Sequence, residues 1–319
     1  MNYQLVITHE NKSYIPSVLE GVVWETERKG IQGKLSFKIV LDEKIIFTEG
    51  DCVTLKVDKA NVFLGFIFSI SNDKDNIASI TAYDQLRYLK NKDTYKIENQ
   101  TASEVIKLLA NDFNLKCGDI EDTSFKIERK IEDNQTLFDI IQNALDLTLA
   151  NTGNLYIFYD DFGKLTLKNL SNMKTNILID DECLENYDYN TSIDNNTYNQ
   201  IKLSYANEET QKREIFIEKD SNNIKQWGLL QYFEDIKENA NAINKAKNLL
   251  KLYNQKSKSL TLKNVCGNTN IRAGSLIMTS LKIRNEKFNT YMLVEKCTHT
   301  FNENNHTMDL MLEGGKLYA

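Results

Sequence analysis

One arrangement of strands and turns occurs twice in the sequence, and this repeat restricts the fold more than any other feature. In the first copy, Gly50-Asp51 precedes a stretch of alternating apolar residues, Cys52 to Val57. Asn61 to Ile70 follows with the same alternation, and Ile77 to Ala82 returns after a polar turn. Alternating apolar residues between Gly, Asn and Asp turns are typical of antiparallel strands that bury one face.

The second copy lies far along the chain and has the same parts in the same order. Gly274-Ser275 precedes Leu276 to Ser280, and Thr290 to Phe301 is the long strand. His306 to Leu312 returns after the polar turn Asn302 to Asn305. The repetition therefore predicts two modules with related strand arrangements.

Upstream of each copy the sequence also repeats. Leu19 to Trp24 resembles Leu184 to Tyr189 at the same spacing, and the returning strands Leu35 to Ile39 and Ile201 to Tyr205 correspond in the same way. Two copies are too few for a solenoid, which needs at least three units to bury a continuous core. We predict an α+β, mainly β fold with two similar small antiparallel β-barrels.

Between the copies the apolar period changes to that of a helix. Thr101 to Glu104 is a capping box, and Cys117-Gly118 is expected to end the helix that it starts. Thr136 begins a second helix, and a hairpin turns at Asp160 to Gly163. Residues 83–180 are therefore predicted to form a small α+β domain.

A further helix is predicted inside the second barrel. Apolar residues recur at helical spacing from Ala242 to Tyr253, with acidic residues before them and lysines after, which suits the helix dipole. We expect the helix to interrupt the second barrel at about residues 219–257. The predicted domains are a first barrel at 1–82, the α+β domain at 83–180 and a second barrel at 181–319.

Composition disfavours several classes of function. Lys+Arg 39 against Asp+Glu 45 gives a net charge of -6 without a basic face, which disfavours sequence-independent nucleic-acid binding, and we predict no specific nucleic-acid partner. The sequence has no apolar run as long as a membrane span and no signal peptide at its N-terminus, so we expect no membrane insertion and no secretion. The five cysteines are scattered without a CxxC motif, which favours reduced, mostly buried thiols.

Candidate catalytic groups are few. Asp161-Phe162-Gly163 spells the magnesium motif of kinases, but the rest of that set is missing, so a hairpin turn is favoured. Asp160-Asp161 and Asp180-Asp181-Glu182 are carboxylate clusters of the kind that a glycosidase uses, although adjacent carboxylates on a loop are usually only solvated. We predict no enzymatic activity and no cofactor.

One cluster invites comparison with a metal site. With Asn302 to Asn305 as the turn, Phe301 faces His306 and His299 faces Met308. Cys297, His299 and His306 would then share a face as candidate zinc ligands. The same face is otherwise apolar, so core packing with hydrogen-bonded imidazoles is favoured over a metal site.

An aromatic segment, Gln226 to Phe233, lies outside any clear strand or helix. It is interpreted either as a plug under the inserted helix or as an apolar patch that docks another subunit. The candidate docking residues are Trp227, Leu229, Leu230, Tyr232 and Phe233.

Several segments together resemble the XkdQ/YqbQ family of phage-like tail proteins. They are Ala82 to Asn91, Thr101 to Leu109, Tyr198 to Ile201, Gln226 to Gln231, Ile271 to Ser275 and Met292 to Glu295. The resemblance extends over nearly the whole chain. Its motifs are strand and cap patterns without catalytic chemistry.

The resemblance implies a baseplate hub protein of a contractile tail, from a phage, a defective prophage or a phage-tail-like bacteriocin. Such hubs are trimers whose two barrels per subunit form a pseudo-sixfold ring between a hexameric tail tube and a trimeric spike. The implied partners are two further copies of the chain, the tail tube protein, the spike protein and other baseplate proteins. The implied location is the baseplate of a virion or phage-tail-like particle, assembled in the bacterial cytoplasm.

In such a ring, the polar face of the hairpin at residues 21–40 becomes a candidate channel lining. The candidate residues are Glu25, Glu27, Lys34, Ser36 and Lys38, with Asp188, Asn190, Lys202 and Ser204 as their counterparts in the second copy. Two alternative functions stay open. A tail-associated peptidoglycan hydrolase predicts a cleft with two separated carboxylates, and a carbohydrate-binding β module predicts an exposed aromatic platform.

Overall fold

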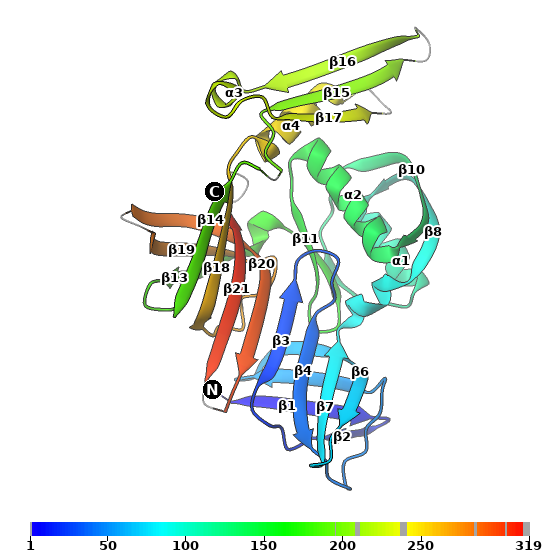
Figure 1. Cartoon of the computed structure of the whole chain (residues 1–319). Helices are drawn as coiled ribbons and strands as arrows, with labels where there is room; N and C mark the ends of the chain where they lie inside the picture. The colour runs from blue at the N-terminus through cyan, green and yellow to red at the C-terminus, as the bar shows by residue number, and fades with distance from the viewer. Residues whose placement is uncertain are drawn as a thin grey trace.

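The computed structural model describes residues 2–194, 196–207, 211–236, 241–283, 286–303 and 305–314 of an α+β chain that is mainly β (Figure 1). The strands of the first copy and its N-terminal extension are β1 (Tyr3–His9), β2 (Lys12–Tyr14), β3 (Val22–Glu27), β4 (Lys34–Val40), β5 (Cys52–Val57), β6 (Ala60–Asn72) and β7 (Ile77–Tyr83). The strands of the second copy are β13 (Lys174–Asp180), β14 (Asn186–Ser192), β18 (Ser257–Cys266), β19 (Leu276–Ile283), β20 (Glu286–Phe301) and β21 (His306–Gly314).

The two copies have the same strand order. The first runs β3-β4-β7-β6-β5-β1, and the second runs β14-β18-β21-β20-β19-β13. The sixth strand is the one that differs in direction, because β1 pairs antiparallel with β5 whereas β13 pairs parallel with β19. The repeat seen in the sequence is therefore a repeat of topology.

Backbone detail matches as well. Gly50 and Gly274 have φ of 91° and 92°, a conformation that favours glycine. Each donates its N–H at 2.8 Å to the long strand, to the carbonyl of Ile67 or of Val294. One residue further on, each long strand has its bulge, at Phe68 in β6 and at Glu295 in β20. This shared bulge fixes which residues of the two copies correspond.

The described strand pairings do not close either copy into a barrel, contrary to the prediction. Instead, β20 pairs with β3, so both copies belong to one 13-stranded sheet. The second half of β20 has β21 on one side and β3 on the other, and the ladder thus continues into the first copy instead of curving back on itself. Alternation along a strand reports its buried face and carries no information about closure.

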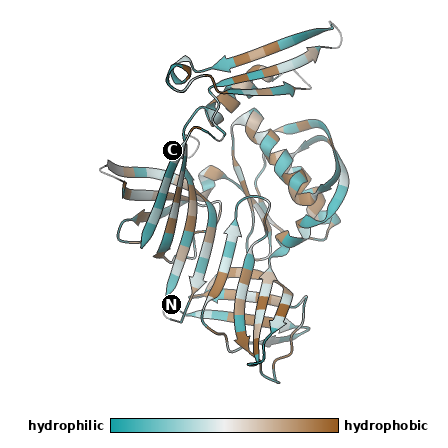
Figure 2. Ribbon diagram, viewed as in Figure 1, coloured by the Kyte–Doolittle hydropathy of each residue, from teal (hydrophilic) through white to brown (hydrophobic). Residues whose placement is uncertain are grey.

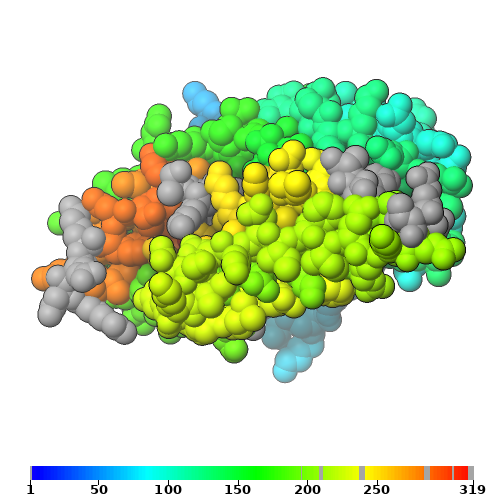
Figure 3. Space-filling view, turned by 90° about the horizontal axis from the view of Figure 1, so that it is seen from above, coloured from blue at the N-terminus to red at the C-terminus, as the bar shows by residue number. Residues whose placement is uncertain are grey.

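The counterpart of β4 also differs from the prediction. By position in the sheet it is β18, whereas Ile201 to Tyr205 lies in an inserted unit between β14 and β18. That unit contains β15 (Gln200–Asn207), β16 (Lys212–Lys219), α3 (Ser221–Trp227), β17 (Gln231–Ile236) and α4 (Ala242–Tyr253). It thus begins before the predicted interruption at 219–257. In Figure 3 its strands cover the face toward the viewer, with α4 between them and the α+β unit.

The α+β unit between the copies contains η1 (Gln85–Lys90), β8 (Lys92–Thr101), α1 (Ala102–Asp112), β9 (Cys117–Ile120), β10 (Lys126–Thr136), α2 (Leu137–Thr152), β11 (Tyr156–Asp160), β12 (Leu165–Asn169) and η2 (Leu170–Met173). The predicted capping box at Thr101 is present, and Thr136 caps α2. The first helix ends at Asp112, before Cys117-Gly118, which begins β9 instead of ending α1.

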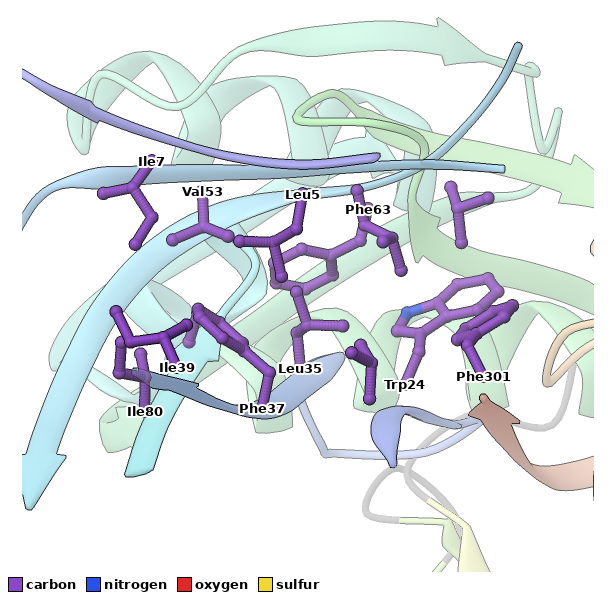
Figure 4. Close-up of a cluster of buried hydrophobic side chains, with 14 of the residues drawn as sticks. Leu5, Ile7, Trp24, Leu35, Phe37, Ile39, Val53, Phe63, Ile80 and Phe301 are labelled. Atoms are coloured by element: carbon purple, nitrogen blue, oxygen red, sulfur yellow. The ribbon is translucent and has the colours of Figure 1, made fainter. Parts of the chain in front are cut away.

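Hydropathy alternates along the strands of the large sheet, so one face is apolar and the other polar (Figure 2). The apolar side of the first copy contains Leu35, Phe37 and Ile39, each at most 3% exposed. Phe301 of β20 belongs to this same cluster and lies beside Trp24 of β3 (Figure 4). The core of the first copy is therefore completed by a side chain from the second.

Candidate functional site

The polar face of the large sheet runs across both copies and contains most of the predicted channel-lining residues. Along β3 and β4 every second residue is buried, and Glu25, Glu27, Lys34, Ser36 and Lys38 occupy the other phase. This confirms the predicted division of the hairpin into an apolar and a charged face.

The strand register carries this face through the junction between the copies. Thr298 of β20 lies opposite Glu25 of β3 on one side and opposite Asp309 of β21 on the other. Glu25 accepts a hydrogen bond from Lys34 at 3.0 Å, and Asp309 accepts one from Lys263 at 2.7 Å. Residues directly opposite each other share a face, so these five side chains form one row across five strands.

The face is nearly balanced in charge and rich in hydroxyls. Its charged side chains include four lysines and four carboxylates, namely Lys34, Lys38, Lys263, Lys296, Glu25, Glu27, Asp188 and Asp309, and Glu313 of β21 lies opposite Ser259 at the same face. Between them lie Ser36, Ser79, Thr81, Ser259, Thr261, Thr298, Thr300 and Thr307. Exposed ion pairs of this kind each contribute little to stability. These charged residues therefore determine the properties of the surface and are not needed to hold the fold together.

Of the four predicted counterparts in the second copy, two lie on this face. Asp188 and Asn190 are exposed on β14, where Asp188 lies opposite Thr261. Lys202 and Ser204 lie instead on β15 of the inserted unit, and Ser204 is only 1% exposed. The residues that take their place lie on β18, which is the true counterpart of β4.

Sequence reasoning missed Ser259, Thr261 and Lys263 of β18 and Lys296 and Thr298 of β20. The signal was present, because these residues alternate with the buried Leu260, Leu262, Cys297 and His299. This alternation does not by itself identify β18 as the counterpart of β4, because Ile201 to Tyr205 shows the same period and comes first along the chain.

The aromatic segment divides between two environments. Trp227 ends α3, and Tyr232 packs against Tyr253 of α4 with ring centroids 5.7 Å apart. Leu230 is half-buried, whereas Leu229 and Phe233 are 58% and 49% exposed. The segment therefore covers the helix in part and also presents apolar side chains on the surface.

The imidazoles considered as zinc ligands form hydrogen bonds in the core, as the core-packing interpretation predicts. His299 Nε2 lies 2.9 Å from the carbonyl of Ile271, which only accepts, so Nε2 carries the proton. His299 Nδ1 then accepts from His306 Nε2 at 2.8 Å. Burial lowers the pKa of His299 to about 3 and that of His306 to about 4. Cys297 Sγ lies 3.1 Å from His299 Nε2, and the described residues contain no group of three metal-ligating side chains suited to an ion.

Two buried carboxyl groups lie where the α+β unit meets the copies. Asp84 accepts hydrogen bonds from the N–H groups of Gly33 and Leu86, and burial raises its pKa well above the usual value. Asp160 accepts from the Gly163 N–H at 2.7 Å, and burial raises its pKa to about 6. The Arg272 guanidinium stacks 4.2 Å from the centre of the Tyr159 ring and opposes both shifts.

The carboxylate clusters considered for catalysis accept backbone hydrogen bonds or begin a turn. Asp160 and Asp161 lie at the start of the tight turn of the β11–β12 hairpin, where the Asp161 N–H donates to the Lys164 carbonyl. Asp181 accepts from the Lys282 N–H, and Asp180 accepts from the Glu182 N–H. Neither cluster places two free carboxyl groups across a cleft.

A hollow of about 650 Å³ lies between the inserted unit, the α+β unit and the large sheet. Its carboxyl groups include Glu234, which forms an ion pair with Lys245 at 2.6 Å, and Glu313. Burial and a hydrogen bond with Glu295 raise the pKa of Glu313 to about 7. Two carboxyl groups in direct hydrogen bond lie closer together than the pair of a glycosidase.

Comparison with known proteins identifies the family. The model of the YQBQ-like family matches residues 22–313, which is most of the chain. The chain belongs to the YQBQ-like family. Within it, the chain is 33% identical over 235 residues to the uncharacterized protein YqbQ of Bacillus subtilis, covering 72% of this chain and 71% of that protein.

The YQBQ-like chain is also 30% identical over 269 residues to the phage-like element PBSX protein XkdQ of Bacillus subtilis, covering 82% of this chain and 81% of the relative. The crystal structure of the 43 kDa tail protein of prophage MuSo2 from Shewanella oneidensis has the same fold, with a TM-score of 0.70 at 11% identity over 99% of this chain and 100% of that one. The resemblance seen in the sequence is confirmed, since the chain belongs to the family that it indicated and has the fold of a phage tail protein. Among the described residues, no helix is long and apolar enough to cross a membrane.

Proposed function

We propose that the protein is the baseplate hub of a contractile tail and acts as a structural adapter without an enzymatic step. Three copies would form a ring of six nearly equivalent sheets, matching a hexameric tail tube on one side and a trimeric spike on the other. The observation that carries the proposal is the duplicated topology, β3-β4-β7-β6-β5-β1 against β14-β18-β21-β20-β19-β13. A doubled module converts threefold symmetry into six similar surfaces.

The polar sheet face is the proposed wall of the central channel. Its lysines and carboxylates are interspersed in nearly equal number, and serine and threonine hydroxyls separate them. A surface with little net charge gives weak long-range attraction or repulsion, so a charged polymer or polypeptide would pass without adhering. Asp188 and Asn190 stay in this proposed lining, together with Lys263 and Thr261 from β18.

Other surfaces would contact neighbouring baseplate proteins. Leu229 and Phe233 are the exposed members of the predicted docking segment and remain its proposed contact residues. A carbohydrate-binding module is less well supported, since Phe233 is the aromatic residue among the exposed large apolar side chains of the described chain and does not form a platform.

The channel proposal is tested by thiol labelling in assembled particles. In a variant without the accessible native cysteines, Lys38→Cys would react with a small maleimide but be protected from a maleimide carrying a large polyethylene glycol. Lys219→Cys, exposed on β16, is the matched control and would react with both. Equal reaction of Lys38→Cys with both reagents would place this face outside the channel.

A further inference from the structure

The junction between the two copies has two unmatched counterparts in the chain's large sheet, one at the edge strand β14 and one along the second half of β6. Inside the chain, β3 of the first copy pairs with the second half of β20. The counterpart of β3 is β14, and the counterpart of β20 is β6. Among the described residues, β14 pairs only with β18, and β6 beyond its bulge pairs only with β7. Each chain therefore has a second pair of strand edges, on β14 and on β6, that correspond to the two strands of the internal junction but do not pair with each other.

Corresponding residues follow from the registers. The bulges align Phe68 with Glu295, so Ser71 of β6 corresponds to Thr298 of β20. Trp24 lies opposite Leu35, and its counterpart Tyr189 lies opposite Leu260. Asn190 therefore corresponds to Glu25.

We infer that the second half of β6 of one chain pairs antiparallel with β14 of the next chain, with Ser71 opposite Asn190 as Thr298 is opposite Glu25. The same register places Ile70 opposite Thr191 and Asn72 opposite Tyr189. The inference rests on the proposed ring and adds to it the contact that closes each of its three joints. Such a contact joins different surfaces of two identical chains and generates a ring when the rotation closes.

Backbone hydrogen bonding supports this register independently. The Asp73 N–H donates to the Ile77 carbonyl, and in an antiparallel ladder bonded and non-bonded pairs alternate. The peptide groups of Ile70 and Asn72 therefore point away from β7, toward the free edge. In the internal junction, the Arg28 N–H donates to the Glu295 carbonyl, which makes Cys297 and Thr26 a bonded pair. Ile70 corresponds to Cys297. The backbone N–H and C=O of Ile70 therefore face the free edge, as a bonded pair at this position requires.

Several polar side chains along the β6 and β14 edges are exposed, as pairing between these two strands requires. Ser69, Ser71 and Asn72 are exposed on β6, and Asn190 and Thr191 are exposed on β14. An unpaired, exposed strand edge is a template for strand addition.

A shallow hollow beside the β6 edge offers room for a side chain of the next copy. It measures about 500 Å³ and is lined by apolar and polar side chains, namely Leu41, Ile45, Ile46, Phe47, Thr48, Glu49, Ile70 and Asn72. At the corresponding place in the second copy, the loop before β19 meets β3, where the Ala273 N–H donates to Thr26 Oγ1 at 2.9 Å. Tyr189, as the counterpart of Trp24, is positioned to cover the hollow, and Ile46, now 56% exposed, would become buried.

Cysteine cross-linking tests the register. The four accessible or half-buried cysteines, Cys52, Cys117, Cys183 and Cys266, are first replaced by serine, and the buried Cys297 is kept. Chains with Ser71→Cys are mixed with chains with Asn190→Cys and oxidised with copper phenanthroline. Since the pair is a non-bonded one, its Cα atoms would be about 4.5 Å apart, which lies within the range that a disulfide spans. Linked dimers are expected in the mixture and in neither chain alone.

The full-length double variant Ser71→Cys/Asn190→Cys is expected to give linked trimers and no larger species. The matched control is Ser79→Cys with Asn190→Cys. Ser79 is exposed on the same face but lies one strand, about 4.8 Å, further away, so linkage is expected to be about tenfold lower. If mass photometry shows trimers but the Ser71–Asn190 pair does not form a disulfide, the proposed strand pairing is wrong and the proposed trimeric hub is not affected. A chain that stays monomeric at every concentration and is not linked would contradict both.

Discussion

The indole of Trp24 stacks on the imidazole of His299, with ring centroids 4.8 Å apart and planes 19° from parallel. Trp24 belongs to β3 of the first copy and His299 to β20 of the second, so this contact spans the junction between the copies. Both residues are buried, at 4% and 0% exposure. The two copies are therefore one packed unit at this point, and mutations here should affect both.

Replacing Trp24 by leucine is expected to lower the free energy of unfolding by about 3 kcal/mol, because it removes a buried ring from the shared core. Urea unfolding of the purified chain measures the change. Phe233→Leu is the matched control, since this ring is 49% exposed, and is expected to change stability by less than about 0.5 kcal/mol. Similar losses in the two variants would contradict a junction core centred on Trp24.

The two equivalent glycines should respond differently to alanine. Gly50→Ala meets no atom within 4 Å and is expected to lose about 1 kcal/mol from the left-handed backbone alone. A Cβ on Gly274 would clash with Cγ2 of Ile157, so Gly274→Ala should lose about 2–3 kcal/mol more. Thermal unfolding of both variants gives the comparison. Equal losses would show that the second copy does not pack against β11 as described.

The buried histidines should make the protein less stable in acid. Burial lowers the pKa of His306 to about 4 and that of His299 to about 3, so between these values and about pH 6.5 the unfolded chain binds more protons than the folded one. Their contribution to stability is thus present above pH 6.5 and is lost as the pH falls. His306→Gln is expected to reduce the loss between pH 7 and pH 4.5 by about 1–2 kcal/mol. Parallel pH profiles for the variant and the parent chain would argue against this cause.

Asp160 should make the protein less stable as the pH rises, which is the opposite of the effect of the histidines. Burial raises its pKa to about 6, so between about pH 4 and pH 6 the folded chain binds the extra proton. Its contribution is present below pH 4 and is lost as the pH rises through 6. Asp160→Asn keeps an acceptor for the Gly163 N–H but cannot ionise, so relative to the parent chain it should gain about 2 kcal/mol between pH 4 and pH 7. Chemical denaturation at several pH values measures the difference, and an unchanged difference across that range would contradict the assignment.

Local sequence patterns predicted much of this structure. The capping residues Thr101 and Thr136 and the spacing of Leu19–Trp24 with Leu184–Tyr189 all hold, because each reflects a contact within one turn or one strand pair. The polar hairpin face was predicted for the same reason. The strand Lys92–Thr101 went unnoticed, since Ile97 and Thr101 are its only buried residues and it shows no clear alternation.

Non-local features could not be predicted in the same way. A period of two identifies a strand but not its neighbour, so Ile201–Tyr205 is predicted as a strand of the second barrel although it belongs to the inserted unit. The joining of β20 to β3 has no signal in either strand, because edge pairing depends on where the two copies meet. For this reason the residues of the polar face from β18 and β20 emerged only from the structure.

Cryo-electron microscopy of the assembled tail particle tests the central claim most directly. The account predicts three copies of the chain in a ring, six related sheets around its axis, and Glu25, Lys34 and Asn190 facing the channel. A reconstruction with another number of copies, or with these three side chains on the outer surface of the particle, would contradict it.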